Sequence, residues 1–169
     1  MKKALKVIND LEKNGIIESY ALGGATALLF YTEPSLTFDV DIFVFLPSGA
    51  DSKKLIDLSP LYVALASKGY RAEKEHVLIE GIPFQFIPVY NALIEEAVLQ
   101  ADTKEYEDTK VKVIKIEYLL AIMVDTNRPK DQERVGKLFG EVKFGKKLLS
   151  TILQRHGLQK RWEKLIEKK

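Results

Sequence analysis

Two aspartates separated by a single residue, Asp39 and Asp41, stand inside the most apolar strand-like segment of the chain, Phe38 to Leu46. Alternate side chains of a strand point to the same face, so both carboxylates share a face that continues with Phe43. Paired carboxylates on a partly apolar face repel each other and lose solvation, which favours a divalent cation between them. An exposed strand face with solvated charges is the alternative. All-oxygen ligands favour Mg²⁺, with Mn²⁺ as the second choice.

A site of this kind is typical of phosphoryl or nucleotidyl transfer. Mg²⁺ accepts one or two carboxylates and takes further ligands from water and substrate phosphates. Upstream, Gly23 and Gly24 separate a short apolar segment from a helical pattern of small residues. Such a turn offers backbone N–H groups to phosphate oxygens. Most glycine pairs are simple turns, so this pair indicates a phosphate-binding turn only in combination with the two acids that follow it.

The elements that must position these groups follow from periodicity. Apolar residues at helical spacing, closed by Asn14-Gly15, predict a first helix over 2–14. Gly81-Ile82 is predicted as a tight connection between two strands. The order of elements predicts an α+β fold, with a mixed β-sheet flanked by helices and a helical C-terminal part. The other predicted strands cover 16–22, 38–46, 70–74, 76–80, 83–89 and 111–114, and the other predicted helices cover 25–31, 52–67, 91–100 and 117–124, with three more after Lys130.

Composition narrows the classes of protein. With 169 residues and 46% hydrophobic residues, the chain can bury one substantial core. The absence of cysteine excludes disulfides, thiolate zinc sites and a cysteine nucleophile. Charged residues interrupt the amino terminus before any signal-like apolar run, and no segment approaches the roughly 20 apolar residues of a membrane span. We therefore expect a cytoplasmic protein without membrane contact.

Charge divides the chain at residue 127. Residues 1–126 carry a net charge of −6, whereas residues 127–169 carry +8. A basic tail can attract a polyanion such as RNA. The same tail can instead be a solvated helical extension docked on its own acidic body.

The motifs together resemble one family. The string Leu22-Gly23-Gly24-Ala25-Thr26-Ala27, followed by Thr37-Phe38-Asp39-Val40-Asp41-Ile42 and later by Arg128-Pro129-Lys130-Asp131, looks like the signature of the DNA polymerase β-like nucleotidyltransferase superfamily. More narrowly, it is similar to minimal nucleotidyltransferases grouped with the abortive-infection type IV toxins. The match covers about residues 16–140. It implies a nucleotidyltransferase-like α/β core over 1–126 and a basic helical extension over 127–169, packed together as one structural unit.

The resemblance also implies roles for residues. Asp39 and Asp41 would be catalytic and would bind the metal. Gly23, Gly24 and Thr37, with Arg128, Lys130 and Asp131, would form the nucleotide site, where Asp131 orients a neighbouring cation. The substrate would be a nucleoside triphosphate, and the acceptor a hydroxyl of RNA (including tRNA), of a protein or of a small molecule. A protein antitoxin is a further partner that the toxin group implies.

One departure from the family weakens the prediction of catalysis. The family has a third acid on the strand after Gly81, where this chain has Gln85. Glutamine offers an oxygen to the metal but no charge, and it cannot act as a general base. Glu73, Glu75 and Glu80 are the nearby acids that could replace it. The family also often has a lysine near Met123, which this chain lacks.

Three functions therefore remain open from the sequence. The first is an Mg²⁺-dependent nucleotidyltransferase, and the second is a catalytically impaired module that binds nucleotide, metal or a partner protein. The third is an unrelated α+β domain, in which Asp39 and Asp41 would face bulk solvent far from Gly24. His76 is expected as an exposed strand-end residue and His156 at a helix end, neither with a catalytic role.

Overall fold

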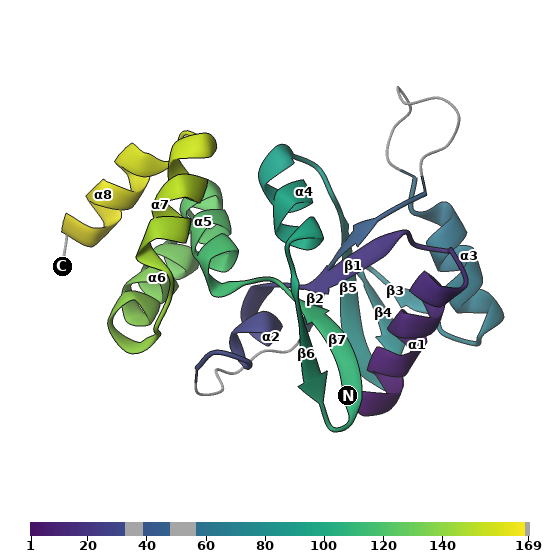
Figure 1. Cartoon of the computed structure of the whole chain (residues 1–169). Coiled ribbons are helices and arrows are strands. Elements are labelled where there is room, and N and C mark those ends of the chain that lie inside the picture. Colours follow the sequence, from purple (N-terminus) through teal and green to yellow (C-terminus); the bar gives the residue numbers. More distant parts are fainter. Residues whose placement is uncertain (33–38, 48–56, 168–169) are drawn as a thin grey trace.

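We analysed a computed structural model of the chain, which describes residues 1–32, 39–47 and 57–167. These residues form a mixed sheet with helices on both sides (Figure 1). The α+β fold predicted from the sequence is confirmed. No helix in the described ranges is both long and apolar enough to cross a membrane.

The sheet has seven strands in the order β3-β4-β5-β2-β1-β7-β6. The central strand β2 runs antiparallel to β1 and parallel to β5, and Asp41 on β2 lies beside Gln85 on β5. The strands are β1 (Ser19–Leu22), β2 (Val40–Phe45), β3 (Ala72–Glu73), β4 (His76–Ile79), β5 (Ile82–Pro88), β6 (Asp102–Tyr106) and β7 (Thr109–Val113).

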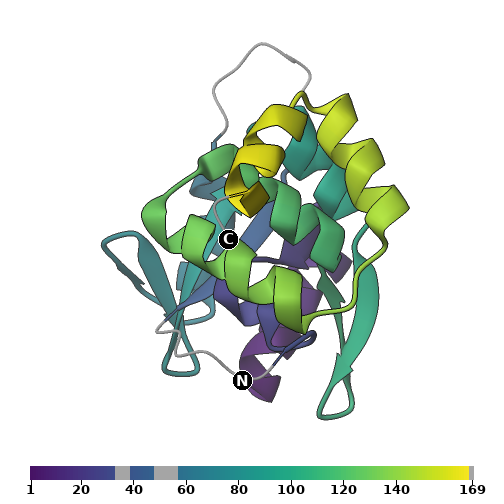
Figure 2. The same ribbon diagram turned by 90° about the vertical axis from the view of Figure 1, so that its left-hand side faces the viewer.

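Two hairpins, β6–β7 at one edge of the sheet and β4–β5 on the other side of β2, differ from the sequence prediction (Figure 2). β6 was not expected, because Asp-Thr-Lys-Glu-Tyr is a polar edge strand whose side chains are at most half-buried. It joins β7 through Glu107 and Asp108, both with positive φ, as a two-residue hairpin turn requires. The predicted Gly81-Ile82 connection is wrong by one residue. Ile79 pairs with Ile82, so the turn consists of Glu80 and Gly81, again with positive φ.

The helices fall on two sides of the sheet in Figure 1, with α1 and α3 on the right and α4 and the α5–α8 group on the left. α1 buries Ala4, Leu5, Ile8 and Leu11, as its apolar spacing predicts. α3 begins at Ser59 with Pro60 in its first turn, so the predicted 52–67 helix starts too early at 57–58, and 52–56 lie outside the described residues. The helices are α1 (Lys2–Lys13), α2 (Gly24–Leu28), α3 (Ser59–Ser67), α4 (Ala92–Leu99), α5 (Ile116–Thr126), α6 (Pro129–Glu141), α7 (Lys146–Arg155) and α8 (Gln159–Glu167).

The α5–α8 group packs through apolar contacts. α5 is buried along most of its length and contacts α4, α6, α7 and α8. On α8, Trp162 packs edge-on against Phe139 of α6 with ring centroids 5.7 Å apart, and so anchors the last helix. α5 ends at Thr126, and the predicted division of the chain after residue 126 stays a prediction.

Candidate active site

The turn between β1 and α2 lies directly against the acidic strand β2. Gly24 has φ +53°, and a Cβ atom there would lie 1.8 Å from Oδ2 of Asp41. At Gly23, a Cβ atom would lie 2.4 Å from the ring of Phe43. The N–H of Gly23 donates to the backbone oxygen of Asp41 at 2.9 Å. Both glycines are therefore required by close approach, and Asp41 and Phe43 share the face that faces the turn.

Asp39 immediately precedes β2 and is held from two sides. The Thr26 hydroxyl on α2 donates to the backbone oxygen of Asp39 at 3.2 Å. Nε2 of His76, at the start of β4, lies 3.4 Å from Oδ2 of Asp39. His76 was expected to be exposed at a strand end, and this was wrong: its side chain is only 25% exposed and touches a predicted metal ligand.

Gln85 takes the place that the third acid would have. Because β5 runs parallel to β2, the register sets Gln85 beside Asp41, and both side chains line the same cavity. The replacement acids proposed from the sequence do not reach it. Glu73 and Glu75 are exposed near the β3–β4 turn, and Glu80 accepts a hydrogen bond from Tyr70 at 2.9 Å.

The electrostatic environment of Asp41 is unfavourable to its charge. Burial and the negative charge of Asp39 raise the pKa of Asp41, and the cations Lys130, Arg128 and Arg134 oppose this only in part. A bound cation would reverse the imbalance.

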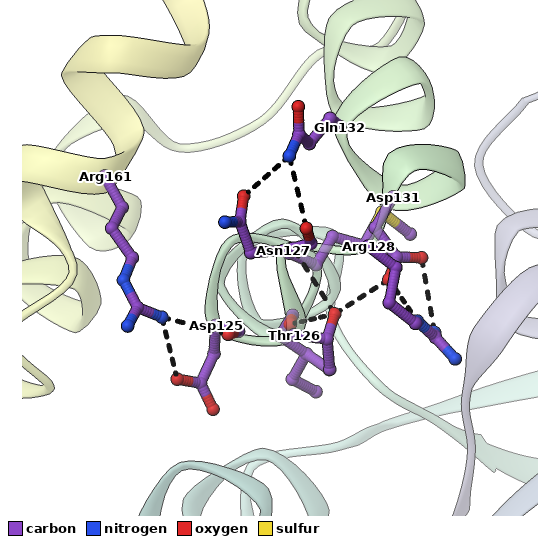
Figure 3. A network of polar contacts seen from close by, with 9 residues as sticks. Asp125, Thr126, Asn127, Arg128, Asp131, Gln132 and Arg161 are labelled. Atoms are coloured by element: carbon purple, nitrogen blue, oxygen red, sulfur yellow. Dashed lines mark hydrogen bonds and ion pairs between the residues drawn. The ribbon is translucent and has the colours of Figure 1, made fainter.

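The junction between α5 and α6 brings the motif Arg128-Pro129-Lys130-Asp131 to the cavity. Asn127 ends α5 in a left-handed conformation with φ +51°, which asparagine tolerates well. Arg128 is extended, as residues before proline are, and Pro129 opens α6. Asn127 is held by Gln132, whose amide donates to its backbone and side-chain oxygens (Figure 3).

Asp131 is the buried acid of this junction. It is 1% exposed and accepts hydrogen bonds from the Thr126 hydroxyl at 2.8 Å and from Nε of Arg128 at 2.5 Å (Figure 3). This pairing raises the pKa of the Arg128 guanidinium and fixes its position. The sequence analysis expected Asp131 to orient a neighbouring cation, and the cation it contacts is Arg128.

These elements enclose a cavity of about 250 Å³ between the sheet and the α5–α6 group. The apolar residues that line it are Ala25, Phe43, Ile87, Leu119, Ile122 and Met123. Tyr90, 53% exposed, also lines it. The polar residues that line the cavity are Gly24, Asp39, Asp41, Gln85, Thr126, Arg128, Lys130, Asp131 and Arg134.

Most of the residues singled out from the sequence meet at this cavity. Gly23 lies in the adjoining turn behind Phe43, and Thr37 lies outside the described residues. Sequence reasoning missed Tyr90, Arg134 and the contact of His76 with Asp39. Arg134 carries one signal that could have found it, because it follows Lys130 by four residues on the same helical face.

Solved structures resemble this chain across nearly its whole length, although no protein-family model and no curated protein matches it. An antigenic nucleotidyltransferase-like protein from Paracoccidioides brasiliensis aligns with a TM-score of 0.64 at 18% identity, covering 99% of this chain and 89% of its own. The chain has a nucleotidyltransferase-like fold. The antibiotic-resistance factor ANT(2'')-Ia aligns with a TM-score of 0.51 at 13% identity, covering 96% and 92%. The narrower similarity to the toxin group stays a prediction.

The structure lacks the arrangement that the third interpretation of the sequence requires. An unrelated domain was expected to place Asp39 and Asp41 in bulk solvent far from Gly24. Asp41 is instead in contact with Gly24, and both line the cavity with Asp39.

The donor set of the cavity suits a hard divalent cation. Asp39 and Asp41 offer carboxylate oxygens, and Gln85 offers an amide oxygen on the neighbouring strand. Within the described ranges, no three acidic or histidine side chains are grouped to hold a metal ion by themselves. A cation here would therefore need water or a ligand's own oxygens to complete its coordination.

Proposed function

We propose that this chain binds a nucleoside triphosphate with Mg²⁺ in the cavity and transfers its nucleoside monophosphate to a hydroxyl group. The observation that carries the proposal is the contact of Asp41 with Gly24, beside Asp39 and opposite the cations of α6. It joins the glycine turn to Asp41, whose charge is disfavoured by burial and by Asp39 and is offset only in part by the nearby cations. The nucleotidyltransferase-like fold supports the same proposal.

Each part of the cavity has a role in this proposal. Asp39, Asp41 and the amide oxygen of Gln85 hold Mg²⁺, which supplies charge stabilisation at the phosphates. The glycine turn receives phosphate oxygens, and Arg128, fixed by Asp131, donates to them. Mn²⁺ would occupy the same oxygen ligands.

The reaction forms one bond and breaks one. The acceptor oxygen attacks the α-phosphorus, and the bond from that phosphorus to the bridging oxygen of pyrophosphate breaks. The acceptor proton passes to water, because Gln85 cannot take it: an amide is not a base at neutral pH. Turnover is therefore expected to be slow.

Gln85 also favours a second candidate function, in which the chain binds nucleotide and metal without transferring a nucleotide and acts through a partner. Both candidate functions use the same binding site, and the choice between them depends on whether Gln85 permits catalysis. The Gln85→Asp variant separates them, because it restores a carboxylate beside Asp41.

The acceptor of the nucleoside monophosphate is proposed from the positive charge of the C-terminal segment. The 127–169 segment carries a net +8, and its Arg155 and Arg161 pair with the body acids Glu96 and Asp125. Lys146, Lys147, Lys160 and Lys164 have no such ion pair within the described part of the chain. RNA, including tRNA, is the acceptor that these cations would attract, with a protein such as an antitoxin as the other partner to test.

Titration calorimetry with Mg²⁺ and each nucleoside triphosphate tests the proposal, followed by pyrophosphate release with RNA, protein and small hydroxyl acceptors. We expect binding that requires Mg²⁺ and that disappears in an Asp39→Ala/Asp41→Ala double variant. Pyrophosphate release that increases in Gln85→Asp supports transfer by this site. Binding without release in either protein favours the non-catalytic module, and absence of binding in all variants excludes both candidates.

A further inference from the structure

The cavity wall formed by α6 carries two cations on one helical face. Lys130 and Arg134 are four residues apart, so their side chains are neighbours on the helix surface, and both line the cavity. Like charges at this spacing destabilise an isolated helix. Such a pair is tolerated best when an anion lies between or beside the two charges.

No anionic side chain of the described residues forms a direct ion pair with either cation, although Asp41 acts on both across the cavity. Neither Lys130 nor Arg134 has an ion pair or side-chain hydrogen bond within the described ranges. The other basic residues of the helix differ. Arg128 is bound to Asp131, and Lys137 lies 4.0 Å from Glu141. Lys130 and Arg134 line the cavity without a direct ion pair among the described residues, and together with Arg128 they act on Asp41.

The location of the pair indicates the kind of anion. The positive charges of Lys130 and Arg134 act on Asp41 across the cavity, so any anion beside them also lies close to the carboxylates. An anion beside two carboxylates must bring a cation with it, as a polyphosphate with Mg²⁺ does. A guanidinium also donates in a planar fork that suits phosphate oxygens.

We propose that Lys130 and Arg134 form a subsite for the terminal phosphates of the nucleotide and for the pyrophosphate that leaves. This inference rests on the proposed function, because it places a nucleoside triphosphate in the cavity. It assigns Arg134, four residues beyond the Arg-Pro-Lys-Asp motif, to substrate binding. Arg134 thereby supplies a cation from α6 where the family's lysine near Met123 is absent.

The inference predicts opposite effects on two ligands. Arg134 repels a free cation near Asp39 and Asp41, so its removal strengthens binding of Mg²⁺ alone. The same removal weakens binding of a polyphosphate, because a charged donor is lost. A purely structural role would weaken both.

The experiment uses the whole chain with inorganic pyrophosphate and tripolyphosphate as probes, each with Mg²⁺, and with Mg²⁺ alone. Arg134→Gln and Lys130→Gln are compared with Arg134→Lys and with the matched control Lys137→Gln, which changes the same helix away from the cavity. Circular dichroism establishes that each variant is folded. We expect Arg134→Gln to weaken polyphosphate binding by about tenfold or more, Arg134→Lys to restore part of it, and Lys137→Gln to change it less than twofold.

The outcomes separate this inference from the proposed function. If Mg²⁺ and nucleoside triphosphate bind but Arg134→Gln and Lys130→Gln leave polyphosphate affinity unchanged, the subsite is wrong and the proposed function stands. If pyrophosphate binds through Arg134 but no nucleotide binds, the proposed function is wrong, and Lys130 and Arg134 bind a polyphosphate that is not part of a nucleotide. Parallel loss of Mg²⁺ and polyphosphate binding in folded Arg134→Gln also overturns the subsite.

Discussion

Two partly buried carboxylates, Glu96 on α4 and Asp41 on β2, lie in opposite environments. Glu96 accepts hydrogen bonds from the Tyr118 hydroxyl at 2.7 Å and from Nε2 of His156 at 2.9 Å, and it forms a close ion pair with Arg155. Burial acts to raise the pKa of Glu96, but these partners together lower it below its ordinary value. Burial and Asp39 raise the pKa of Asp41.

This contrast distinguishes an acid that stabilises the fold from an acid that is available to a ligand. Glu96 connects α4 to α5 and to the end of α7, so its charge holds the α5–α8 group in place. Asp41 has three cations near it, but they do not outweigh burial and the charge of Asp39. An acid compensated within the protein contributes to stability, whereas an acid left uncompensated beside a cavity is available to a ligand.

The largest effect is expected at the turn that shapes the environment of Asp41. In Gly24→Ala, the Cβ atom would overlap the Asp41 carboxylate, and alanine would be strained at φ +53°. We expect unfolding free energy to fall by about 2–4 kcal/mol and Mg²⁺-dependent nucleotide binding to disappear. Denaturant unfolding and calorimetry measure both.

Gly15→Ala is the matched control for this change. Gly15 has φ +70° with no atom within 4 Å of an added Cβ, so only the backbone strain applies. We expect a loss of about 1 kcal/mol and unchanged nucleotide binding. Equal losses in the two variants would show that contact with Asp41 does not matter.

The next largest effect on stability is expected for Glu96, whose charge is compensated within the protein. Glu96→Gln removes the charge that Arg155 and His156 contact, and should cost about 2 kcal/mol of unfolding free energy at neutral pH. Because the folded pKa of Glu96 is lowered, its stabilisation is present above pH 4.5 and disappears as pH falls through the folded value. The difference from wild type should therefore shrink in acid, and a difference that grows below pH 4.5 would contradict the assignment.

Asp131 lines the cavity, and its charge is compensated within the protein by Arg128. Asp131→Asn keeps a hydrogen-bond acceptor for Thr126 but removes the charge that fixes Arg128. We expect about 1–2 kcal/mol less stability and nucleotide affinity lowered several-fold, without loss of Mg²⁺ binding. Unchanged nucleotide affinity would mean that the position of Arg128 is not used by the ligand.

The smallest change in stability, and of opposite sign, is expected for Asp41→Asn. Removing this charge relieves its repulsion from Asp39 and its desolvation. Without added metal, we expect unfolding free energy to rise by up to about 1 kcal/mol. A loss of stability in the presence of a chelator would mean that Asp41 is a compensated acid like Glu96.

The sequence predicted best what a short segment decides by itself. The shared face of Asp41 and Phe43 follows from strand periodicity, and the close turn at Gly24 was expected from the glycine pair ahead of the acids. The helix predicted over 117–124 is α5, which extends a little further at both ends, over Ile116–Thr126. These features need no knowledge of distant contacts.

What the sequence missed depends on contacts between distant segments. His76 reaches Asp39 only because β4 and β5 pair and β5 lies beside β2. Tyr90 and Arg134 meet at the cavity because α5 and α6 lie across it from the sheet face that carries Asp41 and Gln85, which periodicity does not reveal. The polar edge strand β6 lacks the apolar alternation by which strands are recognised.

The most direct test compares the thermal midpoints of wild type, Asp41→Asn and Glu96→Gln before and after addition of Mg²⁺ with a nucleoside triphosphate. A ligand that binds only the folded state raises the midpoint. We predict a clear rise for wild type and for Glu96→Gln, although the latter starts lower, and no rise for Asp41→Asn. An equal rise in all three proteins would show that the ligand does not need Asp41, and would contradict the central claim that this uncompensated carboxylate is a metal ligand.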